Sequence, residues 1–122
     1  MDIQQIRKNA SYLFYCKEYY FLKIKPLDPE SRKTKEYQNL IEIAKLYFEN
    51  NLQSEFASYL MEYQYIVQLW TAHLILEYGN PDSELIKDCL AEIENYSTTP
   101  IDTELAKQEK NWLENYYLKH KK

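Results

Sequence analysis

The sequence predicts an all-α protein of about five helices, packed as stacked antiparallel helical hairpins. Two observations lead to this prediction. Apolar residues recur every three or four positions between the breaks in the chain, and no segment shows the period-two alternation of a half-buried strand. The single glycine and the four prolines fall where helices are expected to stop or start. An up-and-down bundle is the alternative arrangement of the same helices.

The composition indicates one domain, residues 1–122. A chain of 122 residues can bury one core but has no room for a second. Apolar residues make up 45% and charged residues 28%, which is ordinary for a globular protein and too hydrophobic for intrinsic disorder. Tyrosine is the exception, with 13 residues. A tyrosine has a large apolar ring and a hydroxyl that needs a partner or water, so it suits shallow cores and contact surfaces.

The first two helices are predicted near residues 2–24 and 30–49. The first carries two apolar stripes, which indicates neighbours on two sides, and it ends at the segment KPLDPE. The second has one apolar and one charged face, with Asp28 or Ser31 as its expected N-cap.

The third helix, predicted near residues 52–78, is expected to be the central element. Its second half, YIVQLWTAHLIL, is apolar nearly all round, which is typical of a helix covered on several sides. The sequence leaves open whether a break near Met61 divides this segment into two helices. Gly79 is expected to end it in the left-handed conformation, with Asn80 as N-cap and Pro81 in the first turn of the next helix. So short a connection predicts an antiparallel hairpin.

The last two helices are predicted near residues 81–96 and 103–119. The fourth helix turns a stripe that includes Cys89 inward. The fifth begins at the N-cap Asp102 and turns Trp112 inward.

The C-terminal helices also carry a resemblance to known proteins. Successive hairpins with short connections resemble small HEAT-like or armadillo-like arrays over residues 52–119. The tracts LWTAHLILEYG, LIKDCLAEIENY and QEKNWLENY are similar to small helical proteins of bacterial toxin and immunity loci. The resemblance implies an immunity or antitoxin-like protein that covers the substrate site of a basic nuclease-type toxin.

Several classes of chemistry are excluded by the absence of their motifs. With one glycine, the chain has no dinucleotide-binding, Walker A or nucleophile-elbow motif. Its two histidines form no zinc-protease motif, and neither Arg7 nor Arg32 precedes a histidine at the spacing of HEPN-type nucleases. Cys16 and Cys89 have no metal or redox spacing and are expected to be reduced and buried. We therefore predict no catalytic residue, no metal site and no cofactor.

His73 and Glu77 form the one pair that could share a proton, because they lie one helical turn apart. The preferred interpretation is structural, with His73 at a helix interface and one ring nitrogen bonded to a neighbour. The alternative is a small-ligand or enzyme site that uses His73, Glu77 and Cys89, between the third and fourth predicted helices.

The charge distribution favours a protein partner with a basic surface. Residues 54–109 carry two lysines and eleven acidic residues, Glu109 among them, for a net charge of −9 in a chain of net charge −4. Such a segment repels nucleic acid and attracts basic protein surfaces. The alternative is a solvated face without a partner. The candidate partner-binding residues are Glu55, Tyr59, Glu62, Tyr63, Asp82, Glu84, Asp88, Glu92, Glu94 and Tyr96.

These observations predict a non-enzymatic helical module that binds another protein, with a structural or self-associating module as the alternative. Lysines and an arginine near Tyr20 resemble some RNA contacts, but the patch is small and the chain is acidic, so no nucleic-acid partner is expected. No secretory signal or membrane-length apolar segment is found, which predicts a cytoplasmic location.

Overall fold

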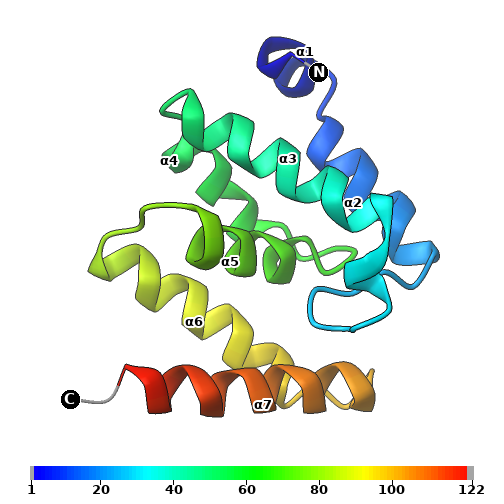
Figure 1. Ribbon diagram of the computed structural model, residues 1–122, viewed down its shortest axis with the longest axis vertical. Coiled ribbons are helices and arrows are strands. Elements are labelled where there is room, and N and C mark those ends of the chain that lie inside the picture. The colour runs from blue at the N-terminus through cyan, green and yellow to red at the C-terminus, as the bar shows by residue number, and fades with distance from the viewer. Residues whose placement is uncertain (1, 121–122) are drawn as a thin grey trace.

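The computed structural model describes residues 2–120 and confirms the all-α class (Figure 1). No strand occurs in this part of the chain, and seven α-helices replace the five that were predicted. They are α1 (Ile3–Lys8), α2 (Ser11–Phe21), α3 (Lys35–Glu49), α4 (Gln53–Ala57), α5 (Val67–Tyr78), α6 (Ser83–Ser97) and α7 (Thr103–Lys119). Two short 3-10 helices, η1 (Ser31–Lys33) and η2 (Ser58–Met61), precede α3 and follow α4.

The predicted helix near residues 2–24 is wrong, because the chain breaks between α1 and α2. Ala10 takes the left-handed conformation there, with φ 51° and ψ 42°. The turn allows α1 to pack against both α2 and α3. The break has no glycine or proline to mark it, and the apolar spacing continues through it.

The second predicted helix starts later than expected, at Lys35. Its N-cap is Thr34, whose Oγ1 accepts a hydrogen bond from the Tyr37 backbone N–H at 3.1 Å. The Asp28 carboxylate instead accepts hydrogen bonds from the backbone N–H and the hydroxyl of Ser31, both at 3.0 Å. Neither Asp28 nor Ser31 therefore caps α3.

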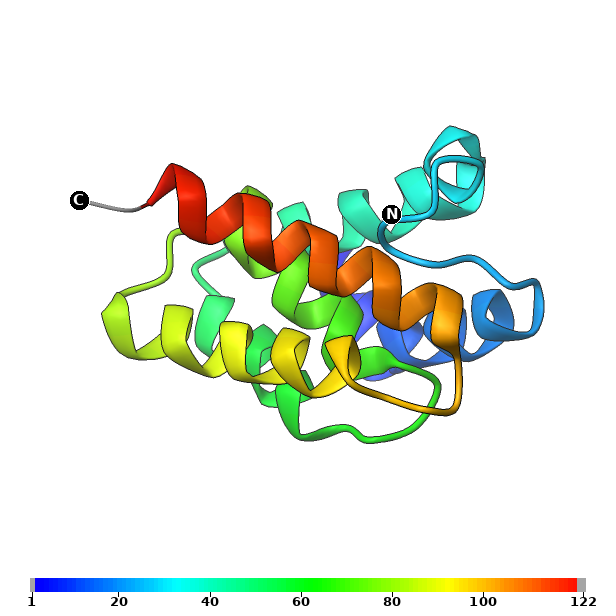
Figure 2. The same ribbon diagram turned by 90° about the horizontal axis from the view of Figure 1, so that it is seen from below.

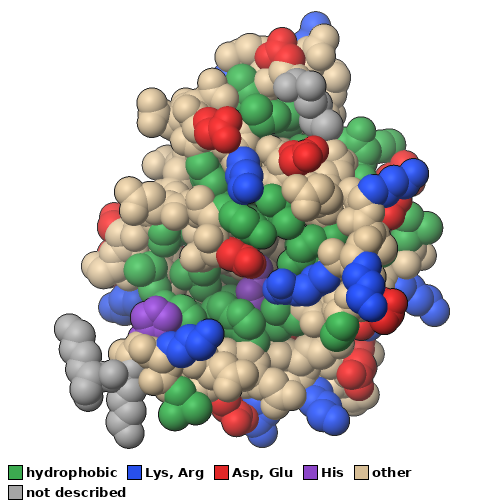
Figure 3. All heavy atoms as spheres, viewed as in Figure 1, with side chains coloured by type: hydrophobic (Ala, Val, Ile, Leu, Met, Phe, Trp, Pro, Cys, Tyr) green, Lys and Arg blue, Asp and Glu red, His purple; other side chains and the backbone are tan. Residues whose placement is uncertain are grey.

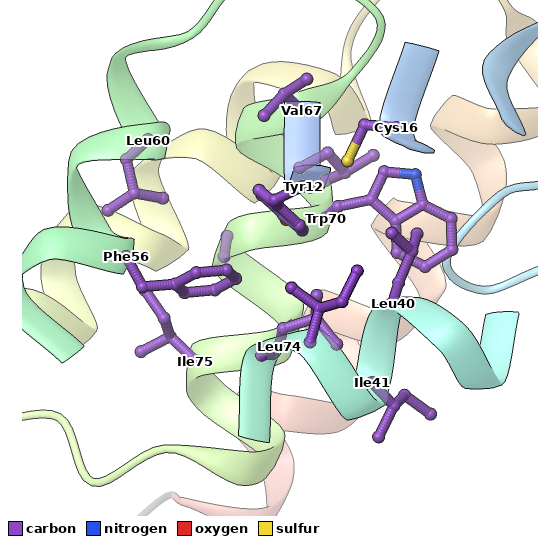
Figure 4. Close-up of a cluster of buried hydrophobic side chains, with 14 of the residues drawn as sticks. Tyr12, Cys16, Leu40, Ile41, Phe56, Leu60, Val67, Trp70, Leu74 and Ile75 are labelled. Atoms are coloured by element: carbon purple, nitrogen blue, oxygen red, sulfur yellow. The ribbon is translucent and has the colours of Figure 1, made fainter. Parts of the chain in front are cut away.

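The third predicted helix is divided after η2, at the break near Met61 that the sequence had left open. Helix α5 is the central element (Figure 1), and its residues 67–75 are all buried. It contacts α2, α3, α4, η2 and α6. Around it lies the core drawn in Figure 4, in which the indole of Trp70 lies beside Leu40 and the ring of Phe56 points into the cluster from another side.

The turn between α5 and α6 differs from the prediction in three respects, one of which is that Pro81 precedes the N-cap of α6 instead of lying in its first turn. Gly79 is not left-handed, since its φ is −89°. It is required for another reason: a Cβ at this position would lie 2.6 Å from Oε1 of Gln53 and 2.8 Å from the Ile75 carbonyl oxygen. The N-cap of α6 is Asp82 rather than Asn80, because the Asp82 carboxylate accepts a hydrogen bond from the Leu85 backbone N–H at 2.9 Å.

The last three helices run back and forth, and α6 packs against both α5 and α7 (Figures 1 and 2). The carboxylate of Asp102 caps α7, as predicted, by accepting a hydrogen bond from the Leu105 backbone N–H at 3.0 Å. None of the helices within residues 2–120 combines the length and apolar character that a membrane crossing requires.

Both cysteines are buried and unpaired, as the sequence predicted. Burial raises the pKa of the Cys89 thiol to about 12 and also raises the pKa of Cys16. Because the thiolate is the reactive form, neither side chain is suited to nucleophilic chemistry.

Candidate functional site

An aromatic groove of about 600 Å³ lies between the end of α2, the segment before α5 and the connection from α6 to α7. Figure 2 shows these three segments near one another. The groove is lined by five aromatic side chains: Tyr20, Phe21, Tyr63, Tyr65 and Tyr96. These side chains come from three parts of the chain, which the fold brings to one surface.

The aromatic groove is exposed rather than closed. Phe21 and Tyr63 are each 66% exposed, and Ile101 on its rim is 91% exposed. The ring of Tyr65 contacts those of Tyr20 and Phe21, with centroids 5.7 and 5.8 Å apart. Grouped apolar side chains of this kind mark interaction surfaces in soluble proteins.

The backbone that forms one wall of the groove has an uncommon conformation. Tyr65 and Ile66 are both left-handed, with φ values of 55° and 51°. This conformation is unfavourable for L-residues and is rarest for β-branched ones such as isoleucine. The turn leads directly into α5, where Val67 is fully buried. Packing of α5 therefore holds the two residues in place and keeps Tyr65 at the groove.

The charged groups of the groove are two lysines and one aspartate. Lys25 and Asp102 form an ion pair at 2.7 Å. This contact lowers the pKa of Asp102, and the backbone N–H of Leu105 lowers it further. Lys23 forms no ion pair within residues 2–120. On the opposite wall, burial raises the pKa of Tyr96 to about 12, with a further contribution from the nearby Glu92 carboxylate.

The structure brings two of the candidate partner-binding residues, Tyr63 and Tyr96, together in the groove. Two others serve the fold. Tyr59 is half-buried against the rings of Tyr12 and Phe56. The carboxylate of Glu55 accepts two hydrogen bonds of 2.7 Å from the Arg7 guanidinium, which joins α4 to α1.

The remaining candidates are distributed along α6 and beside the groove. Glu84, Asp88 and Glu92 recur every fourth residue and so share one side of α6; we call them the acidic ridge. Burial raises the pKa of Glu92, and Asp88 adds to this effect. The others are placed apart from the ridge: Asp82 caps α6, Glu94 accepts a hydrogen bond from the Tyr117 hydroxyl at 2.6 Å, and Glu62 directly precedes Tyr63.

Sequence reasoning missed Phe21 and Tyr65 as groove residues. The signal was present in the run Tyr19-Tyr20-Phe21 at the end of the first predicted helix, because consecutive aromatic residues on a helix cannot all face its core. Nothing local marked Tyr65, whose orientation depends on the left-handed turn.

His73 lies at the interface between α5 and α7, bonded to a residue that the sequence did not suggest. Its Nε2 lies 2.6 Å from Oε1 of Glu109. Glu109 is completely buried, so it does not belong with the acidic surface on which its position in residues 54–109 had placed it. The two side chains therefore share one hydrogen bond between α5 and α7. Glu77 is exposed and makes no hydrogen bond to His73 in the described chain.

A second depression, the histidine pocket, opens above this pair with a volume of about 350 Å³. It is lined by Arg32, His73, Leu76, Glu77, Trp112, Asn115, Tyr116, Lys119 and His120. The pocket thus contains His73 and Glu77 but not Cys89, and it lies between α5 and α7 rather than between the third and fourth predicted helices. Both histidines (purple) are visible on the face drawn in Figure 3.

Aromatic rings form one wall of the histidine pocket. The edge of His73 faces Trp112, with ring centroids 4.8 Å apart. Trp112 stacks on Tyr116 at 5.1 Å, and Tyr116 stacks on His120 at 4.1 Å. Trp112, Tyr116 and the C-cap residue His120 are spaced by four positions and therefore follow one face of α7.

Comparisons with models of protein families, with curated proteins and with solved structures find no match to this chain. The functional proposal therefore rests on the geometry of the chain itself.

The two depressions differ in what they can do. The aromatic groove contains neither histidine nor cysteine and offers apolar contact area with a few hydroxyl and ammonium groups. The histidine pocket offers several groups that can bind an ion or transfer a proton. Within residues 2–120, no group of three or more histidine, cysteine or acidic side chains is placed to hold a metal ion.

Proposed function

We propose that this protein is a non-enzymatic helical module that binds a basic protein through the aromatic groove and the acidic ridge. The observation that supports it most directly is the clustering of exposed apolar side chains. The structure describes nine exposed large apolar residues, and four of them line the groove: Tyr20, Phe21, Tyr63 and Ile101. Exposed aromatic residues of this kind are common anchors of protein interfaces, because each buries a large area with little loss of conformational entropy.

The charge of the surface favours a basic partner. Glu92 lies one helical turn before Tyr96, so the acidic ridge leads to the edge of the groove. Residues 54–109, which supply the ridge and much of the groove, carry a net charge of −9, and ten of their eleven acidic residues remain for the surface once the buried Glu109 is set aside. A field of this sign raises the association rate with a positively charged protein.

The resemblance to proteins of toxin and immunity loci makes a basic nuclease-type toxin the first partner class to test. In such a complex, the carboxylates of the acidic ridge take the place of substrate phosphates. We interpret the back-and-forth course of α5, α6 and α7 as the stacked hairpins of this resemblance, and the cytoplasm as the site of action.

Self-association is the second candidate, because the exposed rings of the groove could equally bury one another in a dimer. Sedimentation at several concentrations distinguishes the two. A monomer at all concentrations excludes self-association, and a dimer that is lost in Phe21→Ser would support it.

The binding proposal is tested by affinity capture from the native host, followed by mass spectrometry. Two variants probe the surface. The first combines Phe21→Ser with Tyr63→Ser in the groove, and the second replaces Glu84, Asp88 and Glu92 of the acidic ridge by lysine. Their controls are Phe14→Ser, which removes an exposed aromatic ring outside the groove, and a lysine triple at Glu18, Glu42 and Glu49. We expect partners captured by the parent and the controls to be lost from both test variants. A folded ridge variant that keeps every partner of the parent would exclude this docking surface.

A further inference from the structure

The histidine pocket holds more hydrogen-bonding groups than the packing of α5 against α7 requires. His73 is 7% exposed, yet its side chain reaches the wall of the pocket. Its Nε2 is bonded to Glu109, while Nδ1 has no hydrogen-bond partner in the described chain. Nδ1 is not fully buried, so it borders the pocket and can bind water or a ligand there.

Two positively charged side chains border the pocket without forming an ion pair in the described chain. They are Arg32 and Lys119. The guanidinium of Arg32 lies over the ring of Tyr37, 5.4 Å from its centroid, which restricts where the group can point. Arg32 comes from η1 and Lys119 from the end of α7, so two separate elements bring the cations to the pocket.

The other walls supply apolar contact, a further polar group and one acceptor. Trp112 and Tyr116 form the aromatic wall, and Asn115 adds an amide. Nδ1 of His120 lies 2.9 Å from the Tyr116 carbonyl oxygen, which can only accept, so the proton is on Nδ1 and Nε2 remains available. Glu77 is the one carboxylate that lines the pocket.

We propose that the histidine pocket binds a small phosphate monoester. Arg32 and Lys119 hold the phosphate, Glu77 accepts from a hydroxyl of the organic part, and that part lies against Trp112. Two cations match the charge of a phosphate monoester, which is roughly −1.5 to −2 near neutral pH. The planar guanidinium of Arg32 can donate two parallel hydrogen bonds to phosphate oxygens. A volume of about 350 Å³ lies at the small end of the range for small-molecule sites.

The proposal is tested by NMR titration of the full chain, following the ring signals of His73 and the indole signal of Trp112. The probes are inorganic phosphate, ribose 5-phosphate, AMP, adenosine and acetate. We expect saturable shifts with ribose 5-phosphate and AMP, with adenosine and acetate binding at least about tenfold more weakly, because they lack the phosphate. No saturable shift from any phosphate compound, or acetate binding as tightly as ribose 5-phosphate, would overturn the proposal.

Variants show whether the pocket itself is responsible. Arg32→Ala and Lys119→Ala each remove an exposed cation and should weaken phosphate binding by roughly tenfold. Arg32→Lys keeps the charge but loses the two parallel N–H donors of the guanidinium, so its phosphate affinity should lie between those of the parent and Arg32→Ala. Lys110→Ala is the matched control, since it removes an exposed lysine of α7 outside the pocket. Unchanged circular dichroism shows that the variants fold. Equal phosphate affinity in Arg32→Ala, Lys119→Ala and Lys110→Ala would refute the site. Phe21→Ser changes the aromatic groove but not the histidine pocket, so phosphate binding should be unaffected in this variant.

Discussion

His73 and Glu109 lie 36 positions apart in the chain and form the closest polar contact between α5 and α7. The helical spacing of His73 and Glu77 suggested a different pair, because residues one turn apart share a helix face. In the fold the two side chains differ in burial, since His73 is buried and Glu77 is exposed. The surroundings of His73 could thus be inferred from its apolar neighbours, but its partner could not, because the packing of α7 against α5 is not encoded by any local pattern.

The buried hydrogen bond between His73 and Glu109 provides a first prediction. His73→Leu leaves the buried Glu109 side chain without its hydrogen-bond partner and should lower the free energy of unfolding by about 1–3 kcal/mol. In the double variant with Glu109→Met, neither polar group remains buried, so the loss should be smaller than in His73→Leu alone. Urea unfolding of the two single variants, the double variant and the parent measures the coupling. A loss below about 1 kcal/mol in His73→Leu would show that water reaches Glu109.

At the scale of the helices, the sequence predicted where helices occur better than where they break. The breaks marked by proline or glycine, at Pro26, Gly79 and Pro100, were all expected. The breaks at Ala10 and at Tyr65–Ile66 carry no such marker, since ordinary residues adopt the left-handed conformation there. Tertiary packing of the flanking helices determines these turns, and a single sequence contains no local signal of it.

Glycine in place of Ala10 should stabilise the protein at the break between α1 and α2. Ala10 is exposed and left-handed, so Ala10→Gly removes a steric cost without removing a contact and should stabilise the protein by up to about 1 kcal/mol. Ala91→Gly is the matched control: it is exposed inside α6, where the same exchange should cost about 1 kcal/mol. Chemical denaturation measures both variants. Destabilisation by Ala10→Gly would mean that α1 and α2 are not turned at this residue.

Gly79 is needed for close approach rather than for a left-handed turn. A methyl group there would meet the Ile75 carbonyl oxygen and Oε1 of Gln53, which accepts a hydrogen bond from the Asn80 backbone N–H at 2.6 Å. Gly79→Ala should therefore cost about 1–3 kcal/mol through crowding. In a Gln53→Ala background the added cost should be smaller, because one of the two clashes is gone. Equal costs in the two backgrounds would assign the effect to the Ile75 carbonyl alone.

At the scale of the whole molecule, the tyrosines divide between the core and the surface. Tyr12 and Tyr47 are fully buried, while Tyr20 and Tyr63 are exposed at the groove. The composition predicted both uses but could not assign individual residues, because the groove is assembled from segments far apart in the chain. The sequence predicted the acidic character of residues 54–109 but not the burial of Glu109, which belongs to that segment.

The buried tyrosines should make the fold sensitive to alkaline pH. Burial raises the pKa of Tyr37 and of Tyr96 to about 12, and it raises the pKa of Tyr12 and Tyr47 as well. A tyrosine in the unfolded chain ionises near about pH 10. The unfolded state therefore loses protons first, so the stabilisation is complete below about pH 10 and is lost as pH rises through about 12.

We therefore expect the free energy of unfolding, measured in urea, to fall steadily from about pH 10 to about pH 12. Tyr37→Phe and Tyr96→Phe should each make that fall shallower, because one buried hydroxyl no longer titrates. Tyr63→Phe is the control, since its ring is exposed in the groove and its removal should leave the slope unchanged. A free energy of unfolding that stays constant across this interval would mean that the tyrosine hydroxyls of the core are hydrated in the folded protein.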